Sequence, residues 1–104
     1  MSGGVNVYPK DIEDVIYTMA EVQDVAVIGI PHATWGEAVH AVIVCRDGAG
    51  LTRDQVTDCC KQKLAPFQIP ASLEFRSELP RNPSGKLLKR VLRQEFWDDK
   101  QVKV

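Results

Sequence analysis

The chain has 104 residues, of which 44% are hydrophobic and 26% charged, and its formal net charge is −1. This length allows one small globular domain and not two, and the near-neutral charge gives no overall electrostatic reason to bind nucleic acid or an anionic membrane. No apolar run approaches the roughly 20 residues of a membrane-spanning helix, and no basic region precedes an apolar core, so we expect neither a transmembrane segment nor a signal peptide.

The chain opens with a glycine-bearing loop, "SGGVNVYP", at residues 2–9. The adjacent Gly3 and Gly4 permit either a tight turn or a close approach of the backbone to a ligand. A loop tied down at only one end is an unusual start for an independent domain. We therefore expect Met1 to mark a cut point in a longer protein.

A helix should follow from Pro9 to about Ala20. Four apolar residues at helical spacing form one stripe: Ile12, Val15, Ile16 and Met19. Pro9 suits the first helical position, and the acidic Asp11 and Glu13 suit the positive end of the helix dipole.

Two strands come next, at residues 22–31 and 38–46. The near-continuous apolar run of the first, "VQDVAVIGIP", predicts burial on both faces of a sheet. The short connection between the strands, "PHATWGE", favours an antiparallel pair. Trp35 in this connection is either a stacking surface for a ligand or a lid on a local core.

A second helix is predicted from Thr52, because Thr52 and Gln55 have the spacing of a capping box. Its core-facing residues should be Val56, Cys59, Cys60 and Leu64. Two prolines in "APFQIPA" end this helix, and Phe67 between them is open to the same two interpretations as Trp35. Residues 72–79, "SLEFRSEL", alternate apolar and polar side chains as a half-exposed strand does.

Residues 79–93, "LPRNPSGKLLKRVLR", predict a turn-rich loop and then a basic helix from about Ser84 to Trp97, with Ser84 as its cap. Lys86 would stand at the start of this helix, where a cation opposes the helix dipole. It is either a solvated lysine or a charge directed at a phosphate or carboxylate. The inner side of the helix should carry Leu88, Val91, Leu92 and Glu95 or Phe96. The basic face of residues 86–93 is either solvated or a docking surface.

This order of elements predicts an α+β domain: a small three-stranded, largely antiparallel sheet flanked by helices and preceded by a glycine-rich loop. The three cysteines, Cys45, Cys59 and Cys60, have no paired zinc spacing with His32 or His40, so we expect neither a disulfide framework nor a metal site. Buried thiols are typical of a reducing compartment, so we expect a cytoplasmic protein.

Three segments together resemble the C-terminal (lid) domain of the adenylate-forming, AMP-binding enzymes. That superfamily contains acyl-CoA synthetases, peptide-synthetase adenylation domains and firefly-type luciferases. The segments are "SGGVNVYPKDIEDVI", "VQDVAVIGIPHATWGEAVHAVIV" and "LPRNPSGKLLKRVLR", and the resemblance covers residues 2–97. It implies that residues 1–104 are such a domain, isolated from the large N-terminal domain that binds most of the ATP and Mg²⁺.

The resemblance implies a ligase that adenylates a carboxylic or fatty acid with ATP and then forms a thioester with CoA. Lys86 would be the catalytic residue of the first step, where it would bridge the substrate carboxylate and the α-phosphate. After a large rotation of the lid, Ser2, Gly3 and Gly4 would line the tunnel for the pantetheine arm of CoA.

Trp35 and Phe67 match the positions of aromatic residues that contact CoA in some relatives. The partners that the resemblance implies are the protein's own N-terminal domain, a small carboxylate, ATP and CoA, and the isolated domain should be inactive. Because no carrier domain follows Val104, we prefer a CoA ligase to a peptide synthetase; a luciferase-like enzyme is the other alternative within the family. An alternative from another class is a free-standing module that binds nucleic acid or a protein through residues 86–93.

Overall fold

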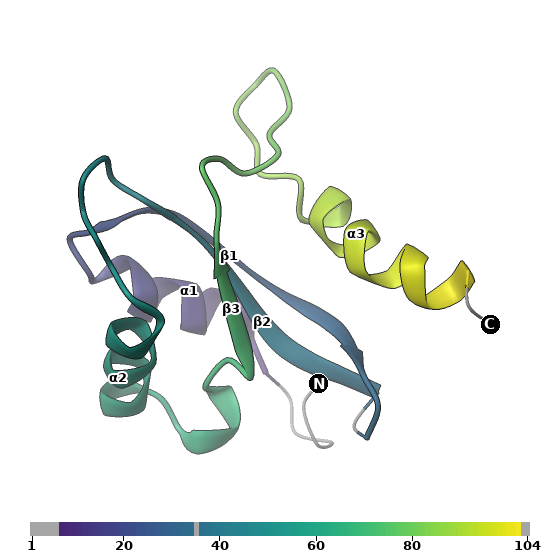
Figure 1. Ribbon diagram of the computed structural model, residues 1–104, viewed down its shortest axis with the longest axis horizontal. Coiled ribbons are helices and arrows are strands. Elements are labelled where there is room, and N and C mark those ends of the chain that lie inside the picture. Colours follow the sequence, from purple (N-terminus) through teal and green to yellow (C-terminus); the bar gives the residue numbers. More distant parts are fainter. Residues whose placement is uncertain (1–6, 35, 103–104) are drawn as a thin grey trace.

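The structure, a computed structural model, describes residues 7–34 and 36–102 (Figure 1). In chain order its elements are α1 (Pro9–Tyr17), β1 (Val22–His32), β2 (Gly36–Cys45), α2 (Arg53–Lys63), the short 3-10 helix η1 (Pro66–Gln68), β3 (Ser72–Phe75) and α3 (Lys89–Val102). The glycine-rich loop around Gly3 and Gly4 and the side chain of Trp35 lie outside the described residues. Within the described ranges, no helix is long and apolar enough to cross a bilayer.

The three strands form one sheet in the order β1-β2-β3. β1 and β2 pair antiparallel from Val22 opposite Cys45 onward, which confirms the predicted hairpin. β3 pairs with β2 in parallel, with Leu73 opposite Ala41. The parallel direction is possible because the connection from β2 to β3 contains α2 and is long enough to return the chain to the same end of the sheet. The predicted α+β class is confirmed, with a mixed sheet.

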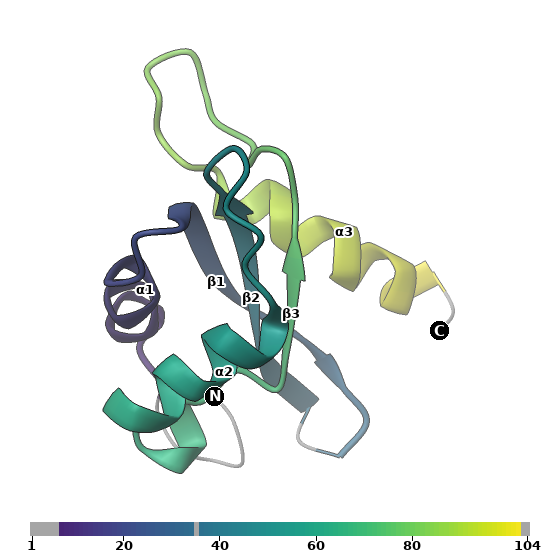
Figure 2. The same ribbon diagram turned by 60° about the vertical axis from the view of Figure 1, so that its left-hand side comes forward.

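Helices cover both faces of the sheet: α1 and α2 lie on one face and α3 lies on the other (Figure 2). On the α1–α2 face, the core contains Val25, Val27, Val39, Ala41, Ile43 and Leu73 of the strands with Ile12, Ile16, Val56 and Cys60 of the helices. On the α3 face, it contains Ala26, Ile28, Val42 and Val44 with Leu79 and Leu92. Successive residues of β1 therefore enter opposite cores, which confirms the predicted burial on both faces.

The first two helices follow the sequence pattern closely. Ile12 and Ile16 are fully buried beneath α1. At the start of α2, the Thr52 hydroxyl accepts a hydrogen bond from the Gln55 N–H, and the Gln55 side-chain oxygen accepts one from the Thr52 N–H, which confirms the capping box. Cys59, which was predicted to face the core, is only half-buried and lies at the rim of the core.

Side chains cover the outer edge of β1, with which no other strand of the described residues pairs. The Glu13 carboxylate accepts a hydrogen bond of 2.8 Å from the Val27 N–H. From the other side, Trp97 Nε1 donates a hydrogen bond of 2.8 Å to the Gly29 carbonyl oxygen. These contacts from α1 and α3 satisfy backbone groups that would otherwise be open to pairing.

The third strand is shorter than predicted: it ends at Phe75, whereas the sequence pattern extended to residue 79. In a continued strand, Leu79 would lie on the same face as Leu73, toward α1 and α2. Leu79 is instead buried in the core on the α3 face. The chain therefore leaves the sheet after Phe75 and crosses to the other side.

Candidate active-site loop

Residues 79–88 form a loop, which we call the Lys86 loop, that projects beyond one end of the sheet (Figures 1 and 2). Asn82 Oδ1 shapes it by accepting hydrogen bonds from the N–H groups of Ser84 (3.1 Å) and Lys86 (2.9 Å) and from the Ser84 hydroxyl (2.7 Å). Gly85 has a φ of 89°, a conformation that glycine adopts without strain. A backbone bridge between Arg81 and Leu87 closes the loop at its base.

The last helix begins at Lys89, so the predicted start near Ser84 was wrong. Asn82 offers residues 82–86 a side-chain alternative to helical hydrogen bonds, and the left-handed conformation of Gly85 cannot continue a right-handed helix. Ser84 is therefore not a helix cap, and Lys86 does not lie in the first turn of a helix. The charge of Lys86 therefore does not oppose the dipole of α3 from within its first turn.

Lys86 itself is exposed near the tip of the loop. Its ammonium group makes no hydrogen bond or ion pair within the part of the chain that the structure describes. A lysine on a four-carbon stem can reach an anion several ångströms from the backbone. The geometry therefore leaves the charge of Lys86 exposed and unpaired among the described residues, on a loop of defined shape.

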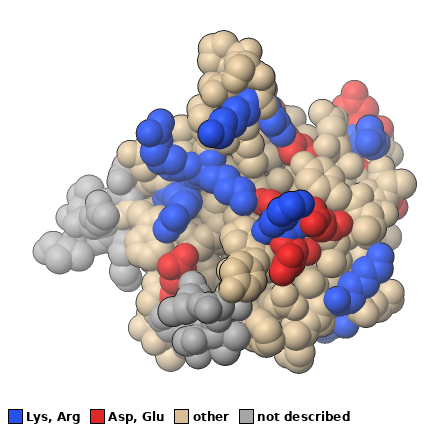
Figure 3. Space-filling model, turned by 180° about the vertical axis from the view of Figure 1, so that it is seen from behind, with Lys and Arg blue, Asp and Glu red and all other residues tan. Residues whose placement is uncertain are grey.

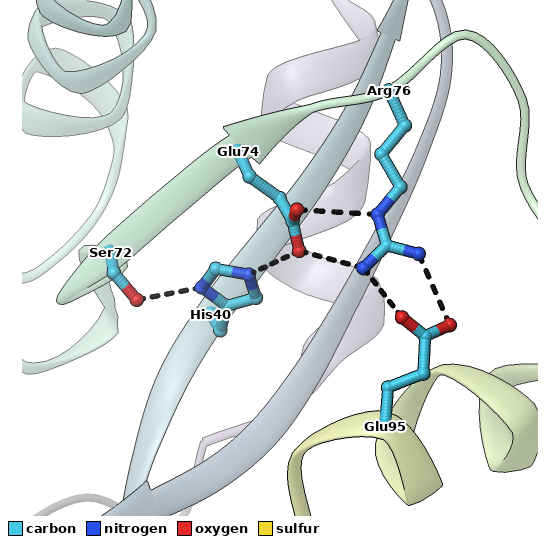
Figure 4. A network of polar contacts seen from close by, with 5 residues as sticks. All are labelled: His40, Ser72, Glu74, Arg76 and Glu95. Carbon is cyan, nitrogen blue, oxygen red and sulfur yellow. Dashed lines mark hydrogen bonds and ion pairs between the residues drawn. The ribbon is translucent and has the colours of Figure 1, made fainter.

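A polar network fastens α3, the helix behind the loop, to the sheet (Figure 4). His40 of β2 is buried, with its ring nitrogens 2.6 Å from Ser72 Oγ and 3.0 Å from Glu74 Oε1. Arg76 donates hydrogen bonds to both Glu74 oxygens and, at 2.9 and 3.2 Å, to both oxygens of Glu95 on α3. The His40 ring also lies edge-on to a ring of α3, that of Phe96, at a centroid distance of 5.0 Å.

The charges of this network stabilise one another. Burial alone would raise the pKa of the Glu74 carboxyl, but hydrogen bonds from Arg76 and His40 outweigh burial and hold this pKa below its usual range. The pKa of Arg76 is raised, first by its hydrogen bonds to Glu95 and then by those to Glu74. The sequence pattern had suggested only that Glu74 and Arg76 face solvent on a strand, and it did not reveal their contact with α3.

Replacing Glu74 with glutamine should change how stability depends on pH. Because the pKa of Glu74 is lower in the folded chain than its ordinary 4.5, the ionised carboxylate stabilises the fold above that value. This stabilisation is lost as the pH falls through the folded pKa. We expect Glu74→Gln to lower the free energy of unfolding near neutral pH and to flatten its decline in acid, as measured by urea unfolding over about pH 3–7.

The exposed Glu78 provides the matched control, because its carboxylate has no partner in the described ranges. Glu78→Gln should leave the acid decline almost unchanged. Equal flattening by the two substitutions would contradict a specific role for the Glu74 network.

Basic side chains gather on one face of the molecule, below the projecting loop (Figure 3). Lys89 is paired with Glu13 of α1 at 2.6 Å, so this residue of the basic segment 86–93 forms an ion pair within the domain. Arg90 and Arg93 are exposed, and the described residues provide no partner for either guanidinium. With Lys89 and Trp97 they line an open groove of about 590 Å³.

The residues proposed to contact CoA are not brought together by the described part of the structure. Ser2, Gly3, Gly4 and Trp35 lie outside it. Phe67 lies on η1 and is 43% exposed, so it is a surface aromatic and not a core residue. This exposure leaves the Phe67 ring free to stack on a ligand or on another domain.

The fold and the loop thus define a small α+β domain in which the ammonium of Lys86 stands exposed on a shaped loop, without a partner among the described residues. The sequence model of the AMP-binding enzyme C-terminal domain matches residues 11–86. The chain belongs to this family, as its three sequence motifs suggested.

Individual relatives agree with this assignment. The chain is 45% identical over 92 residues to a long-chain-fatty-acid–CoA ligase of Haemophilus influenzae, covering 88% of this chain and 16% of the relative. It is 43% identical over 101 residues to the fatty acid–[acyl-carrier-protein] ligase ScoC of Streptomyces coeruleorubidus. The match covers 97% of this chain and 20% of that relative. The ATP-bound structure of MatB from Rhodopseudomonas palustris superposes with a TM-score of 0.89 at 45% identity. The superposition covers 93% of this chain and 19% of the MatB chain. The chain therefore spans no more than a fifth of the length of these relatives.

Proposed function

We propose that residues 1–104 are the C-terminal lid domain of an ATP-dependent acyl-CoA synthetase, an acid–thiol ligase that acts on a carboxylic or fatty acid. The observation that carries this proposal is the exposed, unpartnered ammonium of Lys86 on a loop that Asn82 shapes. The family membership and the fatty-acid ligases among the relatives support it. The isolated domain should be inactive, because it supplies one reacting group and the substrates bind to the N-terminal domain of the same protein.

In the first half-reaction, a carboxylate oxygen of the substrate attacks the α-phosphorus of ATP. A bond forms between that oxygen and phosphorus, and the bond from the α-phosphorus to the departing pyrophosphate breaks. Two anions must approach each other closely, and the ammonium of Lys86 lowers their repulsion by lying between them. The catalytic role of Lys86 is positioning together with charge stabilisation, as expected in phosphoryl-type transfer. Mg²⁺, which would neutralise the phosphates further, is assigned to the N-terminal domain.

In the second half-reaction, the thiol sulfur attacks the acyl carbonyl carbon and AMP departs. We assign Ser2, Gly3 and Gly4 to the tunnel for the pantetheine arm, where side chains would obstruct the passage, and Trp35 and Phe67 to contacts with CoA. The exposed ring of Phe67 supports the last of these assignments. CoA is the proposed acceptor and the cytoplasm is the proposed compartment; an acyl carrier protein as acceptor is suggested by the name of one relative.

Fewer observations support the alternative functions. A peptide-synthetase adenylation domain or a luciferase-like enzyme would share the same lid and the same lysine. A free-standing module that binds nucleic acid or a protein would rest on the exposed Arg90 and Arg93 alone. It would show a salt-dependent affinity that is lost when these charges are reversed.

The test is an assay of both half-reactions in the full-length parent, with Gly4→Leu as the diagnostic variant. Acid-dependent exchange between ATP and pyrophosphate reports adenylation, and consumption of a supplied acyl-adenylate by CoA reports thioester formation. We expect Gly4→Leu to slow thioester formation by about tenfold or more, because the side chain would narrow the tunnel, and to spare adenylation. An unchanged thioester step would remove Gly4 from the tunnel, and a parent without acid-dependent exchange would refute the ligase itself.

A further inference from the structure

One arginine adds a polar link between the Lys86 loop and the body of the domain, beside the packing of Leu79 and Leu87 against the core on the α3 face. Arg81 lies at the base of the loop, and its guanidinium has two sets of contacts. One nitrogen donates a hydrogen bond of 2.6 Å to the carbonyl oxygen of Gly85, the residue directly before Lys86. Another donates to the carboxylate of Asp24, which lies 57 positions away in the sequence. The side chain thus links the backbone at the tip of the loop to the sheet.

The carboxylate that receives Arg81 is itself held in place. Asp24 lies on β1 at the irregularity of the strand register between Val22 and Asp24, and its side chain is only 13% exposed. Its Oδ1 accepts hydrogen bonds from the Tyr17 hydroxyl at 2.7 Å and from the Val25 N–H at 3.0 Å. Since α1 and β1 both hold this carboxylate, the anchor is part of the rigid body of the domain and not of the loop.

The two polar ties of the loop have different consequences. In the described ranges, the Asn82 side chain bonds only to residues within the loop, so it sets the local shape around Ser84 and Lys86. Without a further tie, a loop of that shape could still lean in different directions from its base. Arg81 connects the loop to a fixed point outside it, and so it limits where the Lys86 ammonium can lie relative to the sheet.

We propose that Arg81 is a positioning residue for Lys86, and that its bridge from Asp24 to the Gly85 carbonyl aims the lysine at the substrates. The proposal rests on the function proposed above for Lys86. A displacement of about 1 Å in a reacting or stabilising group can cost on the order of 100-fold in rate. A planar guanidinium donates in two directions from a rigid fork, whereas the donors of a lysine ammonium rotate on a flexible stem and would fix the loop less well.

The experiment compares Arg81→Ala, Lys86→Ala and the double variant in the full-length parent, assaying adenylation and thioester formation separately. We expect Arg81→Ala to lower kcat for adenylation by about 10- to 100-fold, with little change in the KM for ATP and in thioester formation from supplied acyl-adenylate. The double variant should be no slower in adenylation than Lys86→Ala alone, because Arg81 acts only through Lys86. Arg53→Ala, which removes an exposed arginine of α2 that has no partner among the described residues, is the matched control and should change neither rate.

Three outcomes would overturn the positioning role while leaving the role of Lys86 intact. They are normal adenylation in Arg81→Ala, a further loss when Arg81→Ala is added to Lys86→Ala, and an equal loss of both half-reactions. If Arg81→Ala fails to fold, Asp24→Asn decides, since its one oxygen can still accept from Tyr17 while its NH2 group replaces the oxygen that accepts from Arg81. Asp24→Asn should slow adenylation selectively, and full adenylation in it would also overturn the proposal. Normal adenylation in Lys86→Ala would instead refute the proposed function and the positioning role together.

Discussion

Replacing Lys86 with alanine in the full-length parent should slow acyl-adenylate formation by roughly 10²- to 10³-fold, the usual loss when one preorganised group that stabilises transition-state charge is removed. The reason is electrostatic: the ammonium has no partner among the described residues of its own domain, so its charge is available to the reacting anions. Thioester formation from a supplied acyl-adenylate should be largely spared. Pyrophosphate exchange and single-turnover thioester formation measure the two steps separately.

Two further variants sharpen this test. Lys10, another exposed lysine, is paired with Asp14 on the same helix, and Lys10→Ala should leave both half-reactions unchanged. Lys86→Arg keeps a charge but changes its shape and reach, so it should recover adenylation only in part. An equal loss of both half-reactions in Lys86→Ala would contradict the assignment of the lysine to one of two lid positions.

The second large effect is expected on stability. Leu92 of α3 is fully buried against the α3 face of the sheet. Leu92→Ala would leave a cavity there, with an expected loss of about 2–5 kcal/mol in the free energy of unfolding. That is a large part of the roughly 5–15 kcal/mol that stabilises a domain of ordinary size. Urea unfolding of the 104-residue chain measures the loss.

Leu88, which directly precedes α3, is the matched control because it is the same residue type and is only half-buried. Leu88→Ala should cost clearly less than Leu92→Ala. If the two substitutions cost the same, the core on the α3 face would not be the main attachment of this helix.

Sequence patterns predicted the parts of the fold that depend on short-range periodicity. The stripe containing Ile12 and Ile16, the two-sided burial of β1 and the Thr52–Gln55 capping box are all present in the structure. Each depends on residues that are close together in the chain, so spacing alone is informative. The direction of β3 was not predicted, because strand pairing is decided by contacts between distant segments.

The candidate site was predicted less well than the fold. Lys86 was singled out by its motif, but its surroundings were wrongly described as a helix start. Asn82 decides the true conformation through side-chain bonds to the backbone, which helical periodicity cannot reveal. The contacts of Arg81 with Asp24 and of Arg76 with Glu95 join segments far apart in the sequence. A buried histidine in an apolar strand, His40, was the one local signal that a polar network crosses the α3 face.

The covered edge of β1 affects whether two molecules of this domain can associate through their sheets in solution. An open strand edge is a template on which another chain can add a strand, and this is a common route to aggregation. Here the Glu13 carboxylate and the Trp97 indole occupy hydrogen-bonding positions of Val27 and Gly29 that an added strand would need. In the function proposed above, the domain would move between two docked positions and expose its sides to water on the way. With this edge capped by its own helices, it can do so without joining its sheet to that of a neighbouring molecule.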